Sequence, residues 1–159
     1  MRLAPPALLL ALSLCLLTCP AEGQRTPSPE HENLAIWIGD WSYSMGSGSG
    51  TMSFEPFGEF FVRADEVTPN GNEVIHVMGY DPEEGVYTWS RFYSSGYSDA
   101  AKGWVQDNTW TWVFSEPVGS IRRMTIAVES PENFSFKWER SVEGGPWTQM
   151  SEGRTTRVR

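Results

Sequence analysis

The chain has 159 residues, about the length of one domain, and its charged residues give a formal net charge of −8 at pH 7. An acidic surface repels nucleic-acid phosphates and anionic membrane surfaces, so the composition disfavours both as partners. Aromatic side chains are frequent, with 8 Trp, 8 Phe and 5 Tyr, whereas the chain holds only 2 His and 2 Cys. With so few nitrogen and sulfur ligands, neither a metal site nor a cofactor is predicted.

Residues 1–23 have the order of charge, apolar run and small-residue exit that is typical of a secretory signal peptide. Arg2 supplies the charge, residues 7–17 form the apolar run, and Ala21 and Gly23 are small residues suited to cleavage. The apolar run is shorter than the about 20 residues that a membrane-spanning helix needs, so no integral membrane span is predicted in the mature chain. We therefore expect an exported protein, periplasmic or secreted, cleaved after Gly23 or Ala21.

Both cysteines, Cys15 and Cys19, lie within the predicted signal peptide. Residues 16–19 resemble a lipoprotein box, so a lipid anchor at Cys19 is an alternative, which Thr18 and Pro20 make less favourable than free export. Cleavage at the predicted positions removes both thiols, and the mature domain then has neither a disulfide nor a cysteine nucleophile. Its stability must come from the core alone.

Residues 24–33 form a predicted linker or short helix ahead of a β-barrel domain over residues 34–159. Ser28 is a favourable helix N-cap, and Pro29 suits the first helical position. The apolar residues that follow Asn33 are then placed to pack against one end of the domain.

From residue 36 onward, short runs of alternating apolar and polar residues recur with turn residues between them. The strongest hairpin signal is Asn70-Gly71, because Asn-Gly adopts positive φ at low cost. The short connections favour a single antiparallel up-and-down β-barrel of about ten strands, since closure removes exposed edges. The expected strands are residues 36–46, 51–57, 59–68, 73–80, 86–93, 97–105, 108–115, 121–129, 133–142 and 147–158.

Gly39-Asp40-Trp41 resembles the Gly-x-Trp signature of lipocalins and related calycin barrels. Further motifs, in their order and spacing over residues 34–157, resemble the bacterial family known as domain of unknown function 1579. These motifs are Met78-Gly79-Tyr80-Asp81-Pro82, Tyr87-Thr88-Trp89, Gly96, Gly103, Trp110-Thr111-Trp112, Glu152 and Thr156-Arg157. The resemblance implies a barrel similar to lipocalins and fatty-acid-binding proteins. It implies no activity, because the family has no established general one.

The calycin resemblance also implies a plug at one end of the barrel. In such barrels the signature Trp packs against an Arg of the last strand, whose guanidinium stacks on the ring. Trp41 would be this plug, with Arg154 or Arg157 as its partner. Gly39 lacks a Cβ and so allows a sharp bend or a close approach. Gly39, Trp41 and Arg157 are therefore predicted to be structural residues.

Alternation places most aromatic side chains on one face of their strands, and in a barrel that face points inward. Side chains fill a barrel of eight strands, whereas ten strands leave room for a ligand. An aromatic-lined cavity is therefore predicted, with a filled barrel as the alternative. The predicted ligand-binding residues are Tyr43, His76, Met78, Trp89, Arg91, Trp110, Trp112, Phe136 and Trp138.

Polar residues in step with these aromatics indicate where a ligand would be oriented. His76 is expected inside, where it orients a ligand, acts as a general base, or is simply satisfied by buried hydrogen bonds. A register shift by one residue would turn it outward. Arg91 and Arg140 either bind a carboxylate or, as we favour, form ion pairs. The expected acidic partners are Glu139, Glu152 and Asp65.

Three functions remain open from the sequence. The leading hypothesis is an exported, non-catalytic barrel that binds a small hydrophobic or amphipathic molecule. The second is a barrel enzyme, such as an isomerase, cyclase or hydrolase, in which His76 and one of these carboxylates act as acid and base. The third is a filled-barrel interaction module, which predicts no cavity and a large exposed apolar patch. The identity of the ligand and the oligomeric state stay open.

Overall fold

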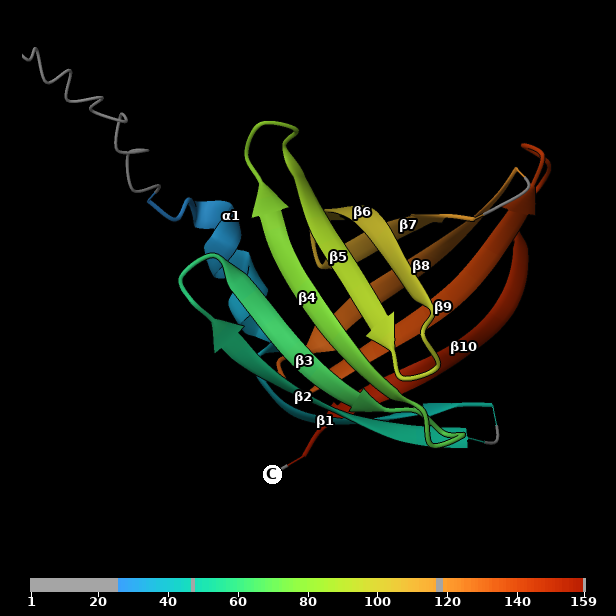
Figure 1. Ribbon diagram of the computed structural model, residues 1–159, viewed down its shortest axis with the longest axis horizontal. Coiled ribbons are helices and arrows are strands. Elements are labelled where there is room, and N and C mark those ends of the chain that lie inside the picture. The colour runs from blue at the N-terminus through green and yellow to red at the C-terminus, as the bar shows by residue number, and fades with distance from the viewer. Residues whose placement is uncertain (1–25, 47, 117–118, 159) are drawn as a thin grey trace, which may run out of the picture.

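The computed structural model describes residues 26–46, 48–116 and 119–158, so the predicted signal peptide and its cleavage site lie outside the described residues. Ten antiparallel strands close into one barrel, preceded by a short helical segment (Figure 1). This segment consists of α1 (Pro29–Glu32) and the 3-10 helix η1 (Asn33–Trp37). The strands are β1 (Gly39–Met45), β2 (Gly48–Phe57), β3 (Phe61–Val67), β4 (Glu73–Asp81), β5 (Val86–Tyr93), β6 (Ser98–Gln106), β7 (Thr109–Ser115), β8 (Ser120–Ser130), β9 (Asn133–Val142) and β10 (Thr148–Arg157).

Each strand pairs with its neighbours in the chain, and β10 returns to pair with β1, where Trp41 lies opposite Arg157. The up-and-down barrel of about ten strands predicted from the sequence is therefore confirmed. Burial alternates along the strands as a barrel requires: Trp110, Trp112 and Phe114 of β7 are buried, and their neighbours are not.

The short N-terminal helix is also confirmed. Ser28 precedes α1 and Pro29 opens it. The backbone N–H of Ser28 donates to Nδ1 of His31 at 3.0 Å, which fixes the first turn. The predicted linker at residues 24–33 is thus helical from Pro29 onward within the described residues.

β1 begins later than the sequence predicts, because Ile36 and Trp37 belong to η1 and the strand starts at Gly39. Gly39 has a φ of +129°, a backbone conformation that residues with a Cβ rarely adopt. A Cβ there would also overlap the guanidinium of Arg157. This bend turns the chain from η1 into β1 and leaves Trp37 buried in the core instead of on the barrel wall.

β2 begins at Gly48, earlier than the predicted start at residue 51, so the glycine-rich stretch is mostly strand. Gly50 lies opposite Tyr43 in the β1–β2 pair. A Cβ on Gly50 would overlap the Tyr43 ring, so the glycine lets this ring lie against the backbone of β2.

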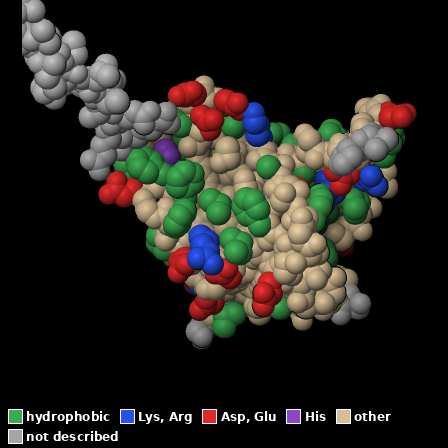
Figure 2. All heavy atoms as spheres, viewed as in Figure 1, with side chains coloured by type: hydrophobic (Ala, Val, Ile, Leu, Met, Phe, Trp, Pro, Cys, Tyr) green, Lys and Arg blue, Asp and Glu red, His purple; other side chains and the backbone are tan. Residues whose placement is uncertain are grey.

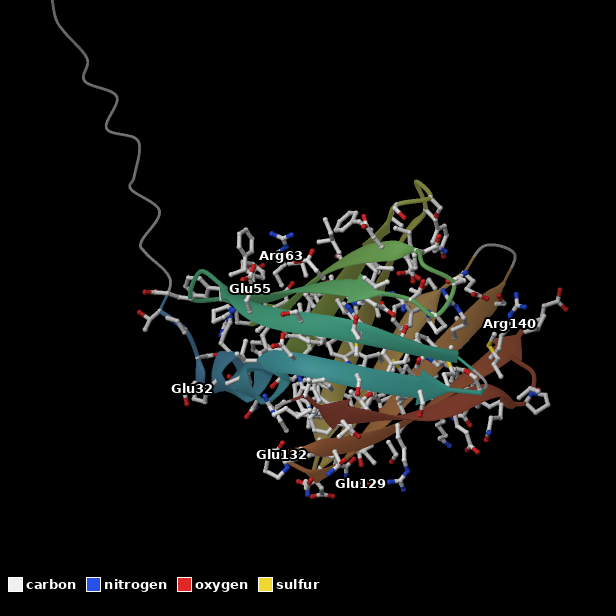
Figure 3. The ribbon with its side chains drawn as sticks, turned by 90° about the horizontal axis from the view of Figure 1, so that it is seen from below. Glu32, Glu55, Arg63, Glu129, Glu132 and Arg140 are labelled. Carbon is white, nitrogen blue, oxygen red and sulfur yellow. The ribbon has the colours of Figure 1, made fainter. Side chains whose placement is uncertain are left out.

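The two ends of the barrel differ. η1 covers one end, where Leu34 and Trp37 are buried together with Trp41. Figure 3 shows Glu32 at this covered end and Arg140 toward the opposite one. The turns that follow β1, β3, β5 and β9 lie at the end opposite η1, which forms the mouth of a cavity.

The outer face seen in Figure 2 carries apolar side chains interspersed with polar and charged ones. Phe61, Ile75, Phe92 and Trp104 are exposed on β3 to β6, and Ile75 lies opposite Phe92 across β4 and β5. Apolar atoms make up much of the surface of folded proteins, so these exposed side chains alone do not indicate a partner.

Candidate functional site

The barrel encloses a cavity of about 420 Å³ that opens at the end opposite η1. Its closed end is formed by Trp37 and Phe134, and its mouth includes Thr68 and Asn72 of the β3–β4 turn. This cavity argues against the filled-barrel alternative. The predicted ligand-binding residues that line it are Tyr43, His76, Met78, Trp89, Arg91, Phe136 and Trp138.

Trp110 and Trp112, which were also predicted as ligand contacts, do not line this cavity. Their rings stack with centroids 5.9 Å apart and an interplanar angle of 12°. Trp37 packs edge-on against Trp110 at 5.4 Å, and Trp89 packs edge-on against Trp112 at 5.2 Å. Trp37 and Trp89 thus line the cavity, and the rings of Trp110 and Trp112 lie behind them in the core. Alternation predicts which face of the strand a side chain occupies, but not which of several inward-facing rings contacts the cavity.

The cavity is apolar at depth and polar near its mouth. Phe54, Met78 and Trp89 line the deeper part, and His76 and Arg91 lie nearer the mouth at one level of the β4–β5 pair. A ligand that fills this space therefore meets apolar side chains with its inner part and polar groups with its outer part.

Every methionine among the described residues lines the cavity. Met78 is deep and only 2% exposed, whereas Met150 at the mouth is 54% exposed. The others are Met45, Met52 and Met124. An unbranched, polarisable thioether side chain fills irregular space and adapts to different shapes. The wall can therefore adjust to a ligand more easily than a wall of branched residues.

A chain of hydrogen bonds runs along the wall from β1 to β5. The Tyr43 hydroxyl donates to Oε1 of Glu66, and Oε2 of Glu66 lies 2.8 Å from Nε2 of His76. Nε1 of Trp89 donates to Nδ1 of His76 at 3.0 Å. Because an indole N–H only donates, Nδ1 must accept, and the proton of the neutral ring is on Nε2, which donates to Glu66. Both nitrogens of this buried imidazole are therefore engaged.

The carboxylate of Glu66 is the acidic centre of this chain. Burial raises the pKa of Glu66, but the hydrogen bonds from His76 and Tyr43 and the charge of Arg91 outweigh burial and leave the pKa below its ordinary value of 4.5. Burial and the hydrogen bond to Glu66 raise the pKa of Tyr43 above its ordinary value of 10.0. At neutral pH, Glu66 is therefore ionised and Tyr43 is a neutral donor.

Arg91 is held by an acid on the neighbouring strand. Its Nε and Nη2 donate to the two carboxylate oxygens of Asp99 at 2.8 and 2.6 Å. The guanidinium also lies 4.3 Å from the ring centroid of Phe114 and 5.3 Å from that of Trp138. Such a bidentate, ring-stacked arginine is strongly oriented.

The ion pairs continue from Arg91 to the rim of the barrel. Nη2 of Arg122 donates to Oδ2 of Asp99 at 3.0 Å, and Arg122 also pairs with Glu116. Glu116 in turn lies 3.0 Å from Nε of Arg140. Alternating charges thus link the cavity wall to the surface, and each charge has an opposite neighbour.

The expectation that Arg91 and Arg140 form ion pairs is met, but the partners named from the sequence were wrong. Glu139 pairs with Arg123 and Lys137 on the outer face of the barrel, and Asp65 pairs with Arg63 there. Glu152 accepts a hydrogen bond from Gln149 instead. These acids lie on the strand faces that point outward, so none of them reaches His76.

Glu66, Asp99 and Arg122 are charged site residues that the sequence prediction missed. Glu66 follows the buried Val62 and Ala64 in step along β3, so it occupies an inward position. Asp99 lies directly opposite Arg91 in the β5–β6 pair. An acidic residue at an inward position, next to an inward cation on a nearby strand, could have identified these residues. Recognising such a pair requires knowledge of the sheet register.

Besides the cavity, two kinds of feature in the described residues would indicate a function, a metal site and a membrane-spanning helix. Within residues 26–46, 48–116 and 119–158, no three His, Cys, Asp or Glu side chains are grouped so that they could hold a metal ion. In the same ranges, no helix has the length and apolarity needed to cross a bilayer.

Comparison with known proteins adds support for the fold alone. No family model matches the chain, and no curated protein matches it. Among solved structures, the crystal structure of Rv2717c from M. tuberculosis is similar, with a TM-score of 0.57 and 13% sequence identity over 83% of this chain and 99% of that one. A redesigned β-barrel matches with a TM-score of 0.39 and 14% identity, covering 79% of this chain and 94% of that one.

Proposed function

We propose that this protein binds a small, mostly apolar molecule in its barrel cavity and does not change it chemically. The observation that carries the proposal is the cavity itself, about 420 Å³ in volume, open at one end and graded from apolar depth to polar mouth. The adaptable methionine wall fits a binding site better than it fits a core selected for tight packing.

The occupied ring of His76 favours binding over catalysis. A general base needs a nitrogen free to take a proton from the substrate. Here Trp89 occupies Nδ1 and Glu66 occupies Nε2. The chain Tyr43–Glu66–His76–Trp89 instead fixes the cavity wall by hydrogen bonds, which is a structural use of the same residues.

Export is part of the proposal and rests on the sequence pattern of residues 1–23 alone. Membership of the domain of unknown function 1579 family is likewise proposed on its motifs. Mass spectrometry of the N-terminus of protein recovered from the periplasm or medium tests export. We expect the chain to start at Gln24 or Glu22, and an intact Met1 in exclusively cytoplasmic protein would contradict it.

Titration with Nile red, a neutral dye whose emission rises in apolar surroundings, tests binding. We expect saturable enhancement with one site per chain and a rise in melting temperature, because a ligand that binds only the folded state must stabilise it. Enhancement without saturation, or no change in melting temperature, would contradict the proposal.

A matched pair of variants locates the binding. Met124→Trp adds a large side chain to the cavity wall, whereas Thr125→Trp adds the same side chain one residue away, on the outer face of β8. Met124→Trp should abolish Nile red binding and Thr125→Trp should leave it unchanged. Equal effects of the two substitutions would place the dye outside the barrel.

A further inference from the structure

Two arginines line the cavity: Arg122, whose side chain is 19% exposed, and the more deeply buried Arg91. Its side chain is 7% exposed and lines the cavity at the level of His76. Its Nε and Nη2 are both taken by Asp99. Among the described residues, no hydrogen bond donated by its Nη1 is found, so this nitrogen has N–H groups that a ligand could accept from.

Asp99 is a buried carboxylate that neutralises positive charge near the mouth of the cavity. Its side chain is only 4% exposed, and it binds Arg91 and Arg122 together, with Nη2 of each at 2.6 and 3.0 Å from Oδ2. A buried carboxylate in such a pair cannot leave its cations without a large desolvation cost. Asp99 therefore stays paired with Arg91 and Arg122 whether or not a ligand is bound.

Among the described residues, the other arginines at the mouth are also paired with carboxylates. Glu116 pairs with Arg122 and Arg140, and the ionised carboxylate of Glu66 lies 2.8 Å from Nε2 of His76, the residue opposite Arg91 in the β4–β5 pair. A ligand carboxylate placed near Arg91 would meet three carboxylates, Asp99, Glu66 and Glu116, that offset the charges of Arg91, Arg122 and Arg140, so no excess positive charge is left to attract it. Like charges brought together out of water repel strongly.

We infer that the cavity favours uncharged ligands over carboxylates, and that Asp99 is the residue that sets this preference. The inference rests on the proposed binding function and deepens it, because it names the ligand class. Arg91 then orients an uncharged ligand: its Nη1 donates a hydrogen bond to a carbonyl or hydroxyl oxygen of the ligand, and the ion pair with Asp99 stays intact.

Cinnamamide and cinnamate test the inference, because they have the same shape and differ in charge at neutral pH. Calorimetry should show that the wild-type protein binds cinnamamide at least about tenfold more tightly than cinnamate. Equal affinities, or tighter binding of cinnamate, would overturn the inference while leaving the binding function intact. Failure of both compounds and of Nile red to bind would instead refute the binding function itself.

Asp99→Asn removes the charge and keeps the shape of the side chain, so it should release Arg91 for a ligand carboxylate. We expect the preference for cinnamamide to fall by about tenfold or to reverse, through tighter binding of cinnamate. Asp65→Asn is the matched control, since this acid is 56% exposed on the outer face and changes the net charge equally. An unchanged preference in folded Asp99→Asn protein would overturn the role of Asp99.

Glu116→Gln provides a second variant if Asp99→Asn does not fold. It removes a carboxylate from the same chain of charges at the rim, where the side chain is 15% exposed. The preference for cinnamamide should shrink in the same direction, by a smaller factor. No change in the preference would overturn the inference that these paired carboxylates exclude anions.

Discussion

The guanidinium of Arg157 lies over the ring of Trp41, with Cζ 4.2 Å from the ring centroid. The same group donates from Nη1 to the carbonyl oxygen of Ile38 at 2.6 Å. Trp41 in turn donates from Nε1 to the carbonyl oxygen of Trp37 at 2.7 Å. The last strand thereby fastens both the first strand and the segment that covers the closed end of the barrel.

Replacement of Trp41 should therefore destabilise the whole domain. Trp41→Ala removes a fully buried ring that also stacks on Phe134 at 4.6 Å, and we expect a loss of about 3–5 kcal/mol in the free energy of unfolding. Arg157→Gln should cost about 0.5–2 kcal/mol through loss of the stacking contact. Urea denaturation measures both, and Arg154→Gln, 69% exposed in its side chain, should change little. A stable Trp41→Ala variant would show that the ring is not a structural plug.

Substitution of Gly39 should be more harmful than substitution of another glycine with positive φ. Gly39→Ala strains a backbone with φ of +129° and pushes a Cβ into Arg157. Gly46→Ala strains a backbone with φ of +58°, but its Cβ would meet nothing within 4 Å. Thermal unfolding should therefore show a larger fall in melting temperature for Gly39→Ala. Equal falls would mean that the contact with Arg157 is of no consequence.

The barrel could be predicted from the sequence because the patterns that specify it lie within short segments of the chain. Alternation reveals the strands, and short turns such as Asn70-Gly71 require each strand to pair with the next. The start of β1 could not be predicted in the same way. Ile36 and Trp37 are as apolar as strand residues, and only their burial at the end of a closed barrel makes the helical conformation favourable.

Glu66 should make the stability depend on pH in the acid range. Its pKa is lowered by folding, so the stability it contributes is complete above its unfolded value of 4.5 and is lost as the pH falls through the lower folded value. The difference in unfolding free energy between wild type and Glu66→Gln should therefore shrink between about pH 7 and about pH 3. Denaturation curves at each pH measure it, and a constant difference would contradict the lowered pKa.

His76 should be replaceable by a residue that keeps both hydrogen bonds. His76→Phe leaves the Trp89 N–H and an oxygen of Glu66 buried without a partner, at about 1–3 kcal/mol for each group. His76→Gln offers a carbonyl to Trp89 and an N–H to Glu66, so it should be the more stable variant. If Phe is tolerated as well as Gln, the hydrogen-bond chain does not stabilise the wall.

The polar part of the site was predicted less completely than its apolar wall. Tyr43 and Trp138 could be placed by strand parity alone, since an aromatic residue in step with others faces the barrel interior. The ion pair of Arg91 with Asp99 depends on which residues lie opposite each other across two strands. That register is set by the turns and by the closure of the barrel together, so it cannot be predicted from the sequence of a single strand.

Methyl NMR of methionine-labelled protein, titrated with cinnamamide, tests most directly whether the cavity is the binding site. Met52, Met78 and Met124 line the cavity, and Met150 lies at its mouth. If the ligand enters the barrel, the methyl resonances of all four residues shift and saturate together with one binding constant. Binding seen by calorimetry while Met52, Met78 and Met124 stay unshifted would mean that the ligand sits outside the barrel.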